Sequence, residues 1–176
     1  RMLLKTLRER APAYVAVAWD SPRPRRRDAL YSGYKAKREA AAESLSVQFP
    51  YARQIVSAYR LACFECPGEE ADDVIATLAR RAIEAGLDVV IVSTDKDLMQ
   101  LVGPHVRLLD TQRERLFGPA EVEEKFGVPP PMMLDFRALT GDSSDNIPGV
   151  RGIGDKGAAQ LLKQFGSLDG LLARSD

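Results

Sequence analysis

Acidic residues recur in four short segments of this 176-residue sequence, at spacings that can bind metal ions. The eight side chains are Asp20, Glu70, Asp72, Asp73, Asp95, Asp97, Asp142 and Asp145. Carboxylate oxygens are hard ligands that suit Mg²⁺ or Mn²⁺. If the eight share one pocket, their mutual repulsion requires cations to neutralise them. Two ions about 4 Å apart would then clamp a phosphodiester, one activating the attacking water and the other stabilising the leaving oxygen.

Each acidic segment also has a local structural explanation. The acidic residues over 70–73 complement the dipole of a helix that begins there. Asp95 and Asp97 can cap a helix beginning near Lys96, and Asp142 can close a turn with Gly141. These local roles do not account for a convergence of all four segments, so both uses stay open at this point.

Alternating strands and helices are expected to position these residues. The pattern predicts strands over 14–19, 62–66, 87–92 and 106–109, and helices over 49–61, 70–85, 119–126 and 131–139. This alternation is typical of a parallel α/β sheet followed by a helical lobe, and the apolar 87–92 strand should be buried on both faces. Ligands of such sheets bind beyond the carboxyl ends of the strands. We therefore expect Asp20 and Asp95, which follow two of the strands, to meet at one edge.

A basic segment over residues 21–46 interrupts the pattern and has no apolar face worth burying. The chain as a whole has 25 basic and 25 acidic residues, but the stretch from Asp20 to Arg38 has seven basic and two acidic ones. Cationic side chains offset phosphate charge, and tyrosines stack on unpaired bases, so this segment can bind nucleic acid. The alternative is a solvated basic loop.

A second anion-binding pattern lies near the end of the sequence. Gly152, Ile153 and Gly154 lead into a predicted helix that contains Lys156. Glycines let backbone N–H groups approach a phosphate, and a helix N-terminus favours anions. A Gly-x-Gly sequence by itself is more often only a turn.

Composition excludes other classes of protein. No apolar run approaches the roughly 18 residues that span a bilayer, so we expect a soluble protein with no membrane partner. Cys63 and Cys66 form one C-x-x-C in a chain with one histidine, which cannot complete a zinc site, and we interpret them as strand cysteines in a reducing cytosol. No signal peptide is visible.

Four segments together resemble the 5′ nuclease domain of bacterial DNA polymerase I and the wider flap endonuclease family. They are Glu-Ala-Asp-Asp-Val at 70–74, Thr-Asp-Lys-Asp at 94–97, Leu-Thr-Gly-Asp-Ser-Ser-Asp-Asn-Ile-Pro-Gly at 139–149 and Gly-Ile-Gly-Asp-Lys at 152–156. The resemblance implies an α/β, PIN-like core with a parallel sheet flanked by helices over residues 1–115, including a basic arch at about 21–46. It further implies a lobe over 116–176 with a helix-hairpin-helix (helix-three-turn-helix) element.

The same resemblance implies roles for individual residues. Asp20, Glu70, Asp72 and Asp73 would form mainly one metal site and Asp142 and Asp145 the second, with Asp95 and Asp97 between two or more Mg²⁺ or Mn²⁺ ions. Tyr34, Lys35 and Arg38 would be catalytic, with Lys35 stabilising charge on the transferring phosphate. Arg27 and Tyr31 would bind DNA in the arch. Gly152, Ile153, Gly154 and Lys156 would grip the duplex backbone, where the family often holds a K⁺ ion.

The family has a further metal-binding aspartate at the end of its first strand, before the position at which this sequence begins. Either the start of the chain is missing here, or the protein lacks one ligand. We favour the first, because losing a central strand would cost more stability than a domain can spare.

The expected function is a two-metal, structure-specific nuclease that removes 5′ flaps and RNA primers from duplex DNA during replication and repair. We expect a monomer in the bacterial cytoplasm, and the sequence leaves open whether a polymerase domain follows Asp176. One alternative is a DNA-binding scaffold with an incomplete, inactive metal site. Another is an RNA-cutting nuclease on a similar fold, against which the duplex-gripping pattern at 152–156 counts.

Overall fold

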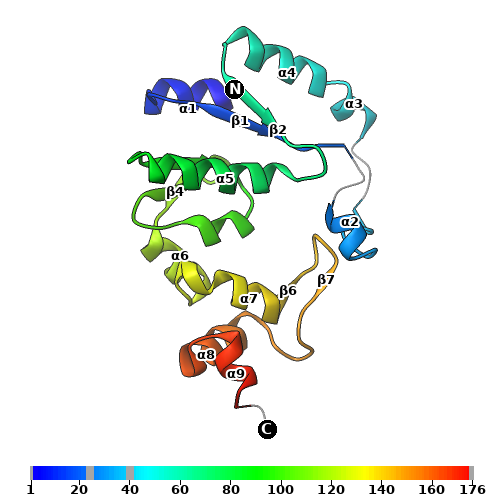
Figure 1. Ribbon diagram of the computed structural model, residues 1–176, viewed down its shortest axis with the longest axis vertical. Helices are drawn as coiled ribbons and strands as arrows, with labels where there is room; N and C mark the ends of the chain where they lie inside the picture. The colour runs from blue at the N-terminus through cyan, green and yellow to red at the C-terminus, as the bar shows by residue number, and fades with distance from the viewer. Residues whose placement is uncertain (1, 23–25, 39–41, 175–176) are drawn as a thin grey trace. The chain divides into compact units, whose positions relative to one another are not determined.

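The computed structural model describes residues 2–22, 26–38 and 42–174, which fall into two compact units (Figure 1). Unit 1 comprises residues 1–31 and 38–75, and unit 2 comprises residues 32–37 and 76–176. The division falls inside helix α5 (Ala71–Glu84), after Ile75. The predicted boundary at residue 115 coincides with strand β5 (Arg115–Phe117), and the predicted domain division stays a prediction.

Unit 1 contains a two-stranded parallel sheet. Strand β1 (Ala16–Trp19) pairs with β2 (Ala62–Glu65), with Ala16 opposite Ala62 and Trp19 opposite Glu65. The Arg53 guanidinium lies 4.7 Å from the centre of the Trp19 ring and donates to the Glu65 carboxylate at 2.6 Å. This cation–π contact and ion pair connect the helix that contains Arg53 to both strands, close to the point where Asp20 follows β1.

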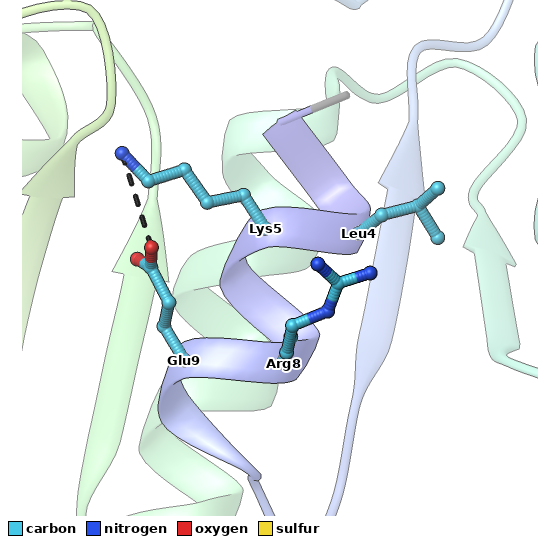
Figure 2. A pocket seen from close by; sticks show the side chains of 4 residues that line it. All are labelled: Leu4, Lys5, Arg8 and Glu9. Atoms are coloured by element: carbon cyan, nitrogen blue, oxygen red, sulfur yellow. Dashed lines mark ion pairs between the residues drawn. The ribbon is translucent and has the colours of Figure 1, made fainter.

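The helices of unit 1 precede, separate and follow these two strands along the chain. They are α1 (Met2–Arg10), α2 (Arg26–Leu30), α3 (Glu43–Ser46) and α4 (Phe49–Ala58), followed by the first turn of α5. Strand β2 is exposed along its length, and Cys63 and Cys66 are exposed free thiols. A hollow on α1 is lined by four side chains of that helix, Leu4, Lys5, Arg8 and Glu9 (Figure 2). It contains none of the predicted site residues.

Unit 2 contains a three-stranded sheet. Strand β3 (Val89–Val92) is parallel to β4 (Val106–Asp110), which is antiparallel to β5. The prediction that the β3 segment is buried on both faces is wrong, because Ile91 is buried whereas Val90 and Val92 are exposed. Side chains alternate between the faces of a strand, so only one face of β3 is covered. The hairpin to β5, which the sequence analysis did not predict, is closed by Asp110, whose carboxylate accepts from the backbone N–H groups of Gln112 and Arg113.

Helices complete unit 2 and bury its core. They are the end of α5, η1 (Asp97–Leu101), α6 (Pro119–Phe126), η2 (Pro130–Met132), α7 (Met133–Thr140), α8 (Asp155–Phe165) and α9 (Leu168–Leu172). Phe136 and Leu139 of α7 are buried, and the Phe126 and Phe136 rings meet edge to face at 5.7 Å. Because α7 packs against η1 and α8, it connects the acidic segment after β3 with the glycine-rich segment before α8.

A short ribbon follows α7 and shapes the third acidic segment. Strand β6 (Gly141–Asp142) pairs antiparallel with β7 (Ile147–Pro148). Gly141 has φ +72°, and a side chain at Gly141 or Gly149 would overlap the backbone of the facing strand. Two glycines therefore let the chain cross itself closely enough to bury Asp142. Across the described residues, no helix is long and apolar enough to cross a membrane.

Candidate active site

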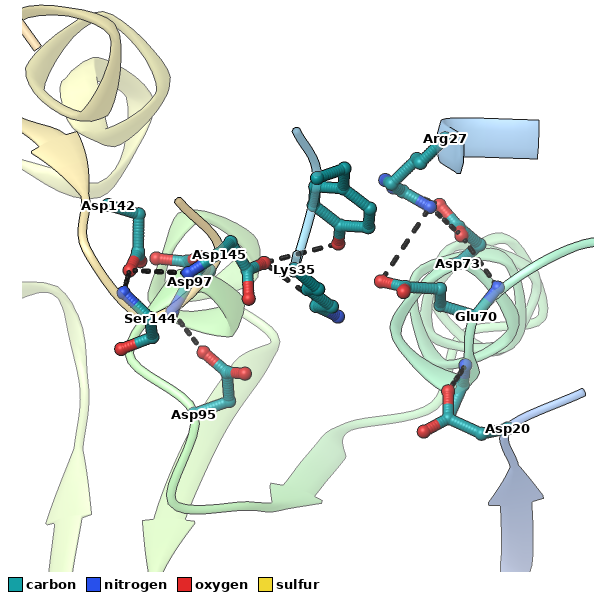
Figure 3. Close-up of polar contacts among 12 residues, drawn as sticks. Asp20, Arg27, Lys35, Glu70, Asp73, Asp95, Asp97, Asp142, Ser144 and Asp145 are labelled. Carbon is teal, nitrogen blue, oxygen red and sulfur yellow. Dashed lines mark hydrogen bonds and ion pairs between the residues drawn. The ribbon is translucent and has the colours of Figure 1, made fainter. Parts of the chain in front are cut away.

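The first carboxylate group, which we define as Asp20, Glu70, Asp72 and Asp73, lies in unit 1. Figure 3 shows Asp20, Glu70 and Asp73 of this group. Asp20 Oδ1 accepts from the Ala71 N–H at 2.9 Å. Ser21 is buried beside it, donating to the Glu69 carbonyl at 2.8 Å and accepting from the Gly68 N–H at 3.2 Å. The end of β1 is therefore bonded to the N-terminus of α5, which brings Asp20 to the start of the helix that carries Asp72 and Asp73 and that Glu70 directly precedes. No sequence pattern singled out Ser21.

Arg27, predicted to bind DNA, is bonded to this first carboxylate group. Its guanidinium donates through both terminal nitrogens to the two oxygens of Asp73, with Nη2 to Oδ1 at 2.8 Å, and Nη1 lies 4.0 Å from Glu70 Oε2. Asp73 also accepts from the Glu70 N–H at the helix start. The hydrogen bonds from Arg27, opposed in part by burial and assisted by the Glu70 N–H, lower the pKa of Asp73. Asp73 is thus an ionised helix cap paired with a fork-shaped cation.

The second carboxylate group, which we define as Asp95, Asp97, Asp142 and Asp145, lies in unit 2 (Figure 3). Asp95 Oδ1 accepts from the Asp97 N–H at 2.9 Å, and Asp142 Oδ1 accepts from the Ser144 N–H at 2.7 Å. Asp95 and Asp142 therefore each accept a local backbone hydrogen bond, in agreement with the structural explanation given for them from the sequence. Those bonds also orient the carboxylates, so the structural role does not exclude metal binding.

Arg137 of α7 joins two members of this second group. Its Nε donates to Asp97 Oδ1 at 2.7 Å, and its Nη2 lies 3.2 Å from Asp142 Oδ2. Lys96 Nζ is 3.6 Å from the same oxygen of Asp142. Arg137 was not predicted from the sequence, although it is the one basic residue of the α7 sequence MLDFRALT. No local pattern marks its function, because the residues it joins are far from each other in the sequence.

The pKa values of the two bridged carboxylates, Asp97 and Asp142, are shifted in opposite directions. Burial raises the pKa of Asp97, and the charges of Asp95 and Asp142 add to the effect, while Arg137 opposes it. Burial also disfavours the charged form of Asp142, but the Ser144 N–H, Lys96 and Arg137 together lower its pKa. These opposing shifts indicate negative charges crowded together and only partly compensated.

Tyr34 and Lys35, two of the three predicted catalytic residues, contact Asp145. The Tyr34 hydroxyl donates to Asp145 Oδ2 at 3.1 Å, and Lys35 Nζ lies 3.7 Å from that oxygen. Both side chains are buried, with exposed fractions of 6% and 8%, so the expectation that the 21–46 segment has nothing worth burying is wrong at these positions. Lys35 has φ +52° and its N–H donates to the Asp145 carbonyl at 2.9 Å. A left-handed lysine persists only where its surroundings hold it, which indicates a defined position for Lys35.

The other predicted DNA-binding residues lie on the surface. Tyr31 at the end of α2 and the third predicted catalytic residue, Arg38, are exposed. Gly152, Gly154 and Lys156 are exposed and Ile153 half-buried around the start of α8. Gly154 is the N-cap of α8 and has no side chain that could accept from the first N–H groups of this helix. Arg23 and Arg25 of the basic segment lie outside the described residues.

The donor chemistry of both carboxylate groups fits hard divalent cations, since every candidate ligand is a carboxylate. Within the described ranges, however, no three Asp, Glu, His or Cys side chains come close enough together to hold a metal ion. Arginine and lysine side chains compensate these carboxylates instead. The two groups lie in different units, and their convergence into one pocket stays a prediction.

Two family descriptions together match the whole chain. The 5′-3′ exonuclease N-terminal resolvase-like domain matches residues 1–127, and the 5′-3′ exonuclease C-terminal SAM fold matches residues 128–176. The chain therefore belongs to the 5′-3′ exonuclease family. The predicted fold class, an α/β core with a parallel sheet followed by a helical lobe, is confirmed.

Individual relatives include polymerases and a stand-alone protein. DNA polymerase I of Rhizobium leguminosarum is 49% identical over 181 residues, covering 99% of this chain and 18% of that protein. A 5′-3′ exonuclease of Aquifex aeolicus is 40% identical over 172 residues, covering 98% of this chain and 60% of that protein. The chain thus spans about a fifth of the polymerase and three-fifths of the exonuclease.

Solved structures share the fold at low sequence identity. The T5 5′-exonuclease with bound divalent zinc ions has a TM-score of 0.86 at 22% identity, covering 98% of this chain and 68% of that one. The catalytic core of Rad2 in complex with a DNA substrate has a TM-score of 0.57 at 15% identity, covering 92% of this chain and 51% of that one. These likenesses support the fold of the chain.

Proposed function

We propose that this chain is the metal-dependent 5′ nuclease part of a DNA replication and repair protein. It would hydrolyse phosphodiester bonds at 5′ flaps, 5′ ends and RNA primers of duplex DNA. The observation that carries the proposal is the match to the 5′-3′ exonuclease family along the whole chain, including all four acidic segments. Its relatives include DNA polymerases I, so we propose that a polymerase domain belongs to the same protein.

The first carboxylate group would hold one divalent ion and the second carboxylate group another. Mg²⁺ or Mn²⁺ is the proposed metal, because all eight candidate ligands are carboxylates and none is a cysteine or histidine. The bound ions would lower the pKa of the attacking water and stabilise the leaving oxygen. Arg27 would have to release Asp73 for a metal to bind both oxygens of that carboxylate, since a bidentate guanidinium already uses them.

Tyr34 and Lys35 would act at the phosphate bound near Asp145. Their contacts with Asp145 support this role, because they place a hydroxyl donor and an ammonium group beside a candidate metal ligand. Lys35 would offset charge that develops on the transferring phosphoryl oxygens, and Arg38 would supply a further cation. Arg27 and Tyr31 would contact the single strand near the cut.

Duplex DNA would be bound at the start of α8. The exposed glycines at 152 and 154, the N-terminus of α8 and the exposed Lys156 support backbone contacts without sequence readout. The carbonyl groups of this glycine-rich turn would suit a K⁺ ion between protein and phosphate. Such a contact would be expected on duplex DNA more than on single-stranded RNA.

The proposal is tested by incubating the full-length protein with a 5′-flapped duplex that carries a 5′ label. With Mg²⁺ we expect cleavage near the junction. With EDTA we expect the protein to bind the DNA equally well but not to cleave it. Binding without cleavage at any Mg²⁺ or Mn²⁺ concentration would favour the DNA-binding scaffold. Preferred cleavage of single-stranded RNA would favour the RNA-cutting alternative.

A further inference from the structure

Arg137 differs from Lys96, the other cation beside Asp142, in how its side chain is held. It belongs to α7, between Phe136 and Leu139, whose side chains are buried in the core of unit 2. The Arg137 side chain is 18% exposed, whereas that of Lys96 is 42% exposed. A guanidinium on a stem fixed by a packed helix has few alternative positions, whereas an exposed ammonium has many.

The guanidinium of Arg137 connects carboxylates of two separate elements. Nε and Nη2 both lie within 2.7 Å of Asp97 Oδ1 at the start of η1, and Nη2 reaches Asp142 Oδ2 of β6 at 3.2 Å. Two carboxylates of like charge would otherwise repel each other. The planar fork of arginine can bind both, while a lysine offers one point charge. Arg137 therefore holds η1 and β6 at a fixed separation through their charged side chains.

One of the two bridged carboxylates is also fixed by a backbone group of its own loop. Asp142 accepts from the Ser144 N–H through Oδ1, the oxygen that Arg137 does not contact. The Asp97 N–H in turn orients Asp95. Arg137 thus acts on three of the four members of the second carboxylate group, two directly and Asp95 through the backbone of Asp97.

We propose that Arg137 is a positioning residue for the metal site of unit 2. It keeps Asp97 and Asp142 together before a divalent cation binds, and so lowers the cost of assembling the ligands. This inference rests on the proposed function, because it assumes that the second carboxylate group binds metal. Residues that orient metal ligands typically contribute about 10-fold or more to metal affinity.

The test is Mn²⁺ binding without DNA, measured from the free-ion signal in electron paramagnetic resonance. The protein is compared with its Arg137→Met, Arg137→Lys and Asp97→Asn variants. Arg113→Met is the matched control, because Arg113 pairs with the buried Asp110 at 2.8 Å in the same unit but outside the carboxylate group. We expect about 10-fold weaker binding in Arg137→Met, about threefold weaker binding in Arg137→Lys and no change in Arg113→Met.

A metal titration of flap cleavage separates positioning from general damage to the fold. If Arg137 positions ligands, Arg137→Met should need more Mn²⁺ for half-maximal rate but reach nearly the same plateau, since a cation can itself draw the two carboxylates together. A lower plateau with an unchanged metal requirement would overturn the inference. Unchanged or tighter Mn²⁺ binding in Arg137→Met would also overturn it, because Arg137 would then only compete with the metal.

Two further outcomes are distinguishable. If Arg137→Met does not fold, as judged by circular dichroism, the Arg137→Lys variant decides, and binding equal to that of the unaltered protein overturns the inference. If the unaltered protein binds no Mn²⁺, or Asp97→Asn binds it as well, the proposed metal site itself fails. Loss of binding in Asp97→Asn with normal binding in both Arg137 variants rejects the role of Arg137 alone.

Discussion

Arginine side chains compensate the candidate metal ligands in each unit. Arg27 pairs with Asp73 in unit 1, and Arg137 joins Asp97 to Asp142 in unit 2. Grouped carboxylates need positive charge nearby to stay ionised, and a guanidinium supplies it in a directional form. In the proposed site, Arg137 would keep Asp97 and Asp142 together for a cation. Arg27 would have to release Asp73 before a cation could bind both of its oxygens.

Asp95 and Asp97 are the residues whose loss should most clearly separate cleavage from DNA binding. Replacing both by alanine removes two candidate ligands, and we expect flap cleavage to fall by about 100-fold or more. DNA binding should change little, because neither side chain belongs to the proposed duplex contact at α8. Single-turnover cleavage and a binding titration with the same labelled flap measure the two effects. Normal cleavage by the double variant would remove both residues from the site.

Arg27→Met should lower stability in a pH-dependent manner. Arg27 depresses the pKa of Asp73 below its usual value of 3.8, so the ion pair stabilises the folded state above that value and stops doing so as pH falls through the lower folded-state pKa. Because both partners are about one-third exposed, we expect a loss of about 1 kcal/mol or less at pH 7. The difference should vanish in strong acid.

Urea unfolding at pH 7 and at successively lower pH measures this effect. Arg80→Met, which changes an exposed arginine on α5, is the matched control and should show no such pH dependence. A stability difference between Arg27→Met and the unaltered protein that stays constant down to acid pH would contradict the assignment to Asp73.

At the scale of elements, the ribbon between α7 and α8 depends on two glycines. Gly141 and Gly149 face each other across β6 and β7, and an added Cβ at either would overlap backbone atoms of the other segment. Val150 then donates to the Leu139 carbonyl at 2.8 Å, which ties the chain back to the end of α7. This close crossing places Asp142 within hydrogen-bond distance of Arg137. The chain then continues to the glycine-rich start of α8.

Gly149→Ala should therefore destabilise unit 2. The new methyl group would meet the Thr140 carbonyl, and backbone atoms cannot move aside as the end of a side chain can. We expect a loss of about 1 to 3 kcal/mol, typical of overpacking. Gly103→Ala is the matched control, since nothing lies within 4 Å of a Cβ there. Equal thermal midpoints for the two variants would show that the crossing is looser than the structure indicates.

Across the whole molecule, charge is separated although the net charge is zero. Basic residues concentrate between Asp20 and Arg38, while acidic residues form the two carboxylate groups and Lys156 lies exposed at the start of α8. A chain with no net charge can therefore bind DNA at local basic sites while repelling it elsewhere. Such binding should depend strongly on salt.

Lys156→Ala should weaken duplex binding modestly and reduce its salt dependence. Losing one phosphate contact lowers the slope of log affinity against log salt concentration by about 0.9. Fluorescence anisotropy with a nicked duplex at several salt concentrations measures that slope. Lys163→Ala, at the other end of α8, is the matched control. The same slope in Lys156→Ala as in the unaltered protein would argue against a phosphate contact at Lys156.

Local patterns were sufficient for most elements and for the candidate ligands. Strand positions at 16–19, 62–65, 89–92 and 106–110 agree with apolar runs, and Asp20 and Asp95 follow such runs as predicted. The ribbon of β6 and β7 and the hairpin strand β5 were not predicted, because they consist of two or three residues and depend on turns between them. Burial of β3 was overestimated for a different reason, since an apolar strand does not reveal which of its faces will be covered.

The sequence by itself determined the family, the order of the elements and the eight carboxylates, because these depend on residue types and spacings along the chain. Only the tertiary structure decided which charges compensate one another: Arg27 with Asp73, Arg137 with Asp97 and Asp142, and Lys35 with Asp145. Most of these partners are 40 or more residues apart, and even Arg137 and Asp142, five residues apart, belong to different elements. Ionic contacts depend on distances of a few ångströms in space. No periodicity or motif within one segment records such a distance, so the pairing became visible only once the chain was folded.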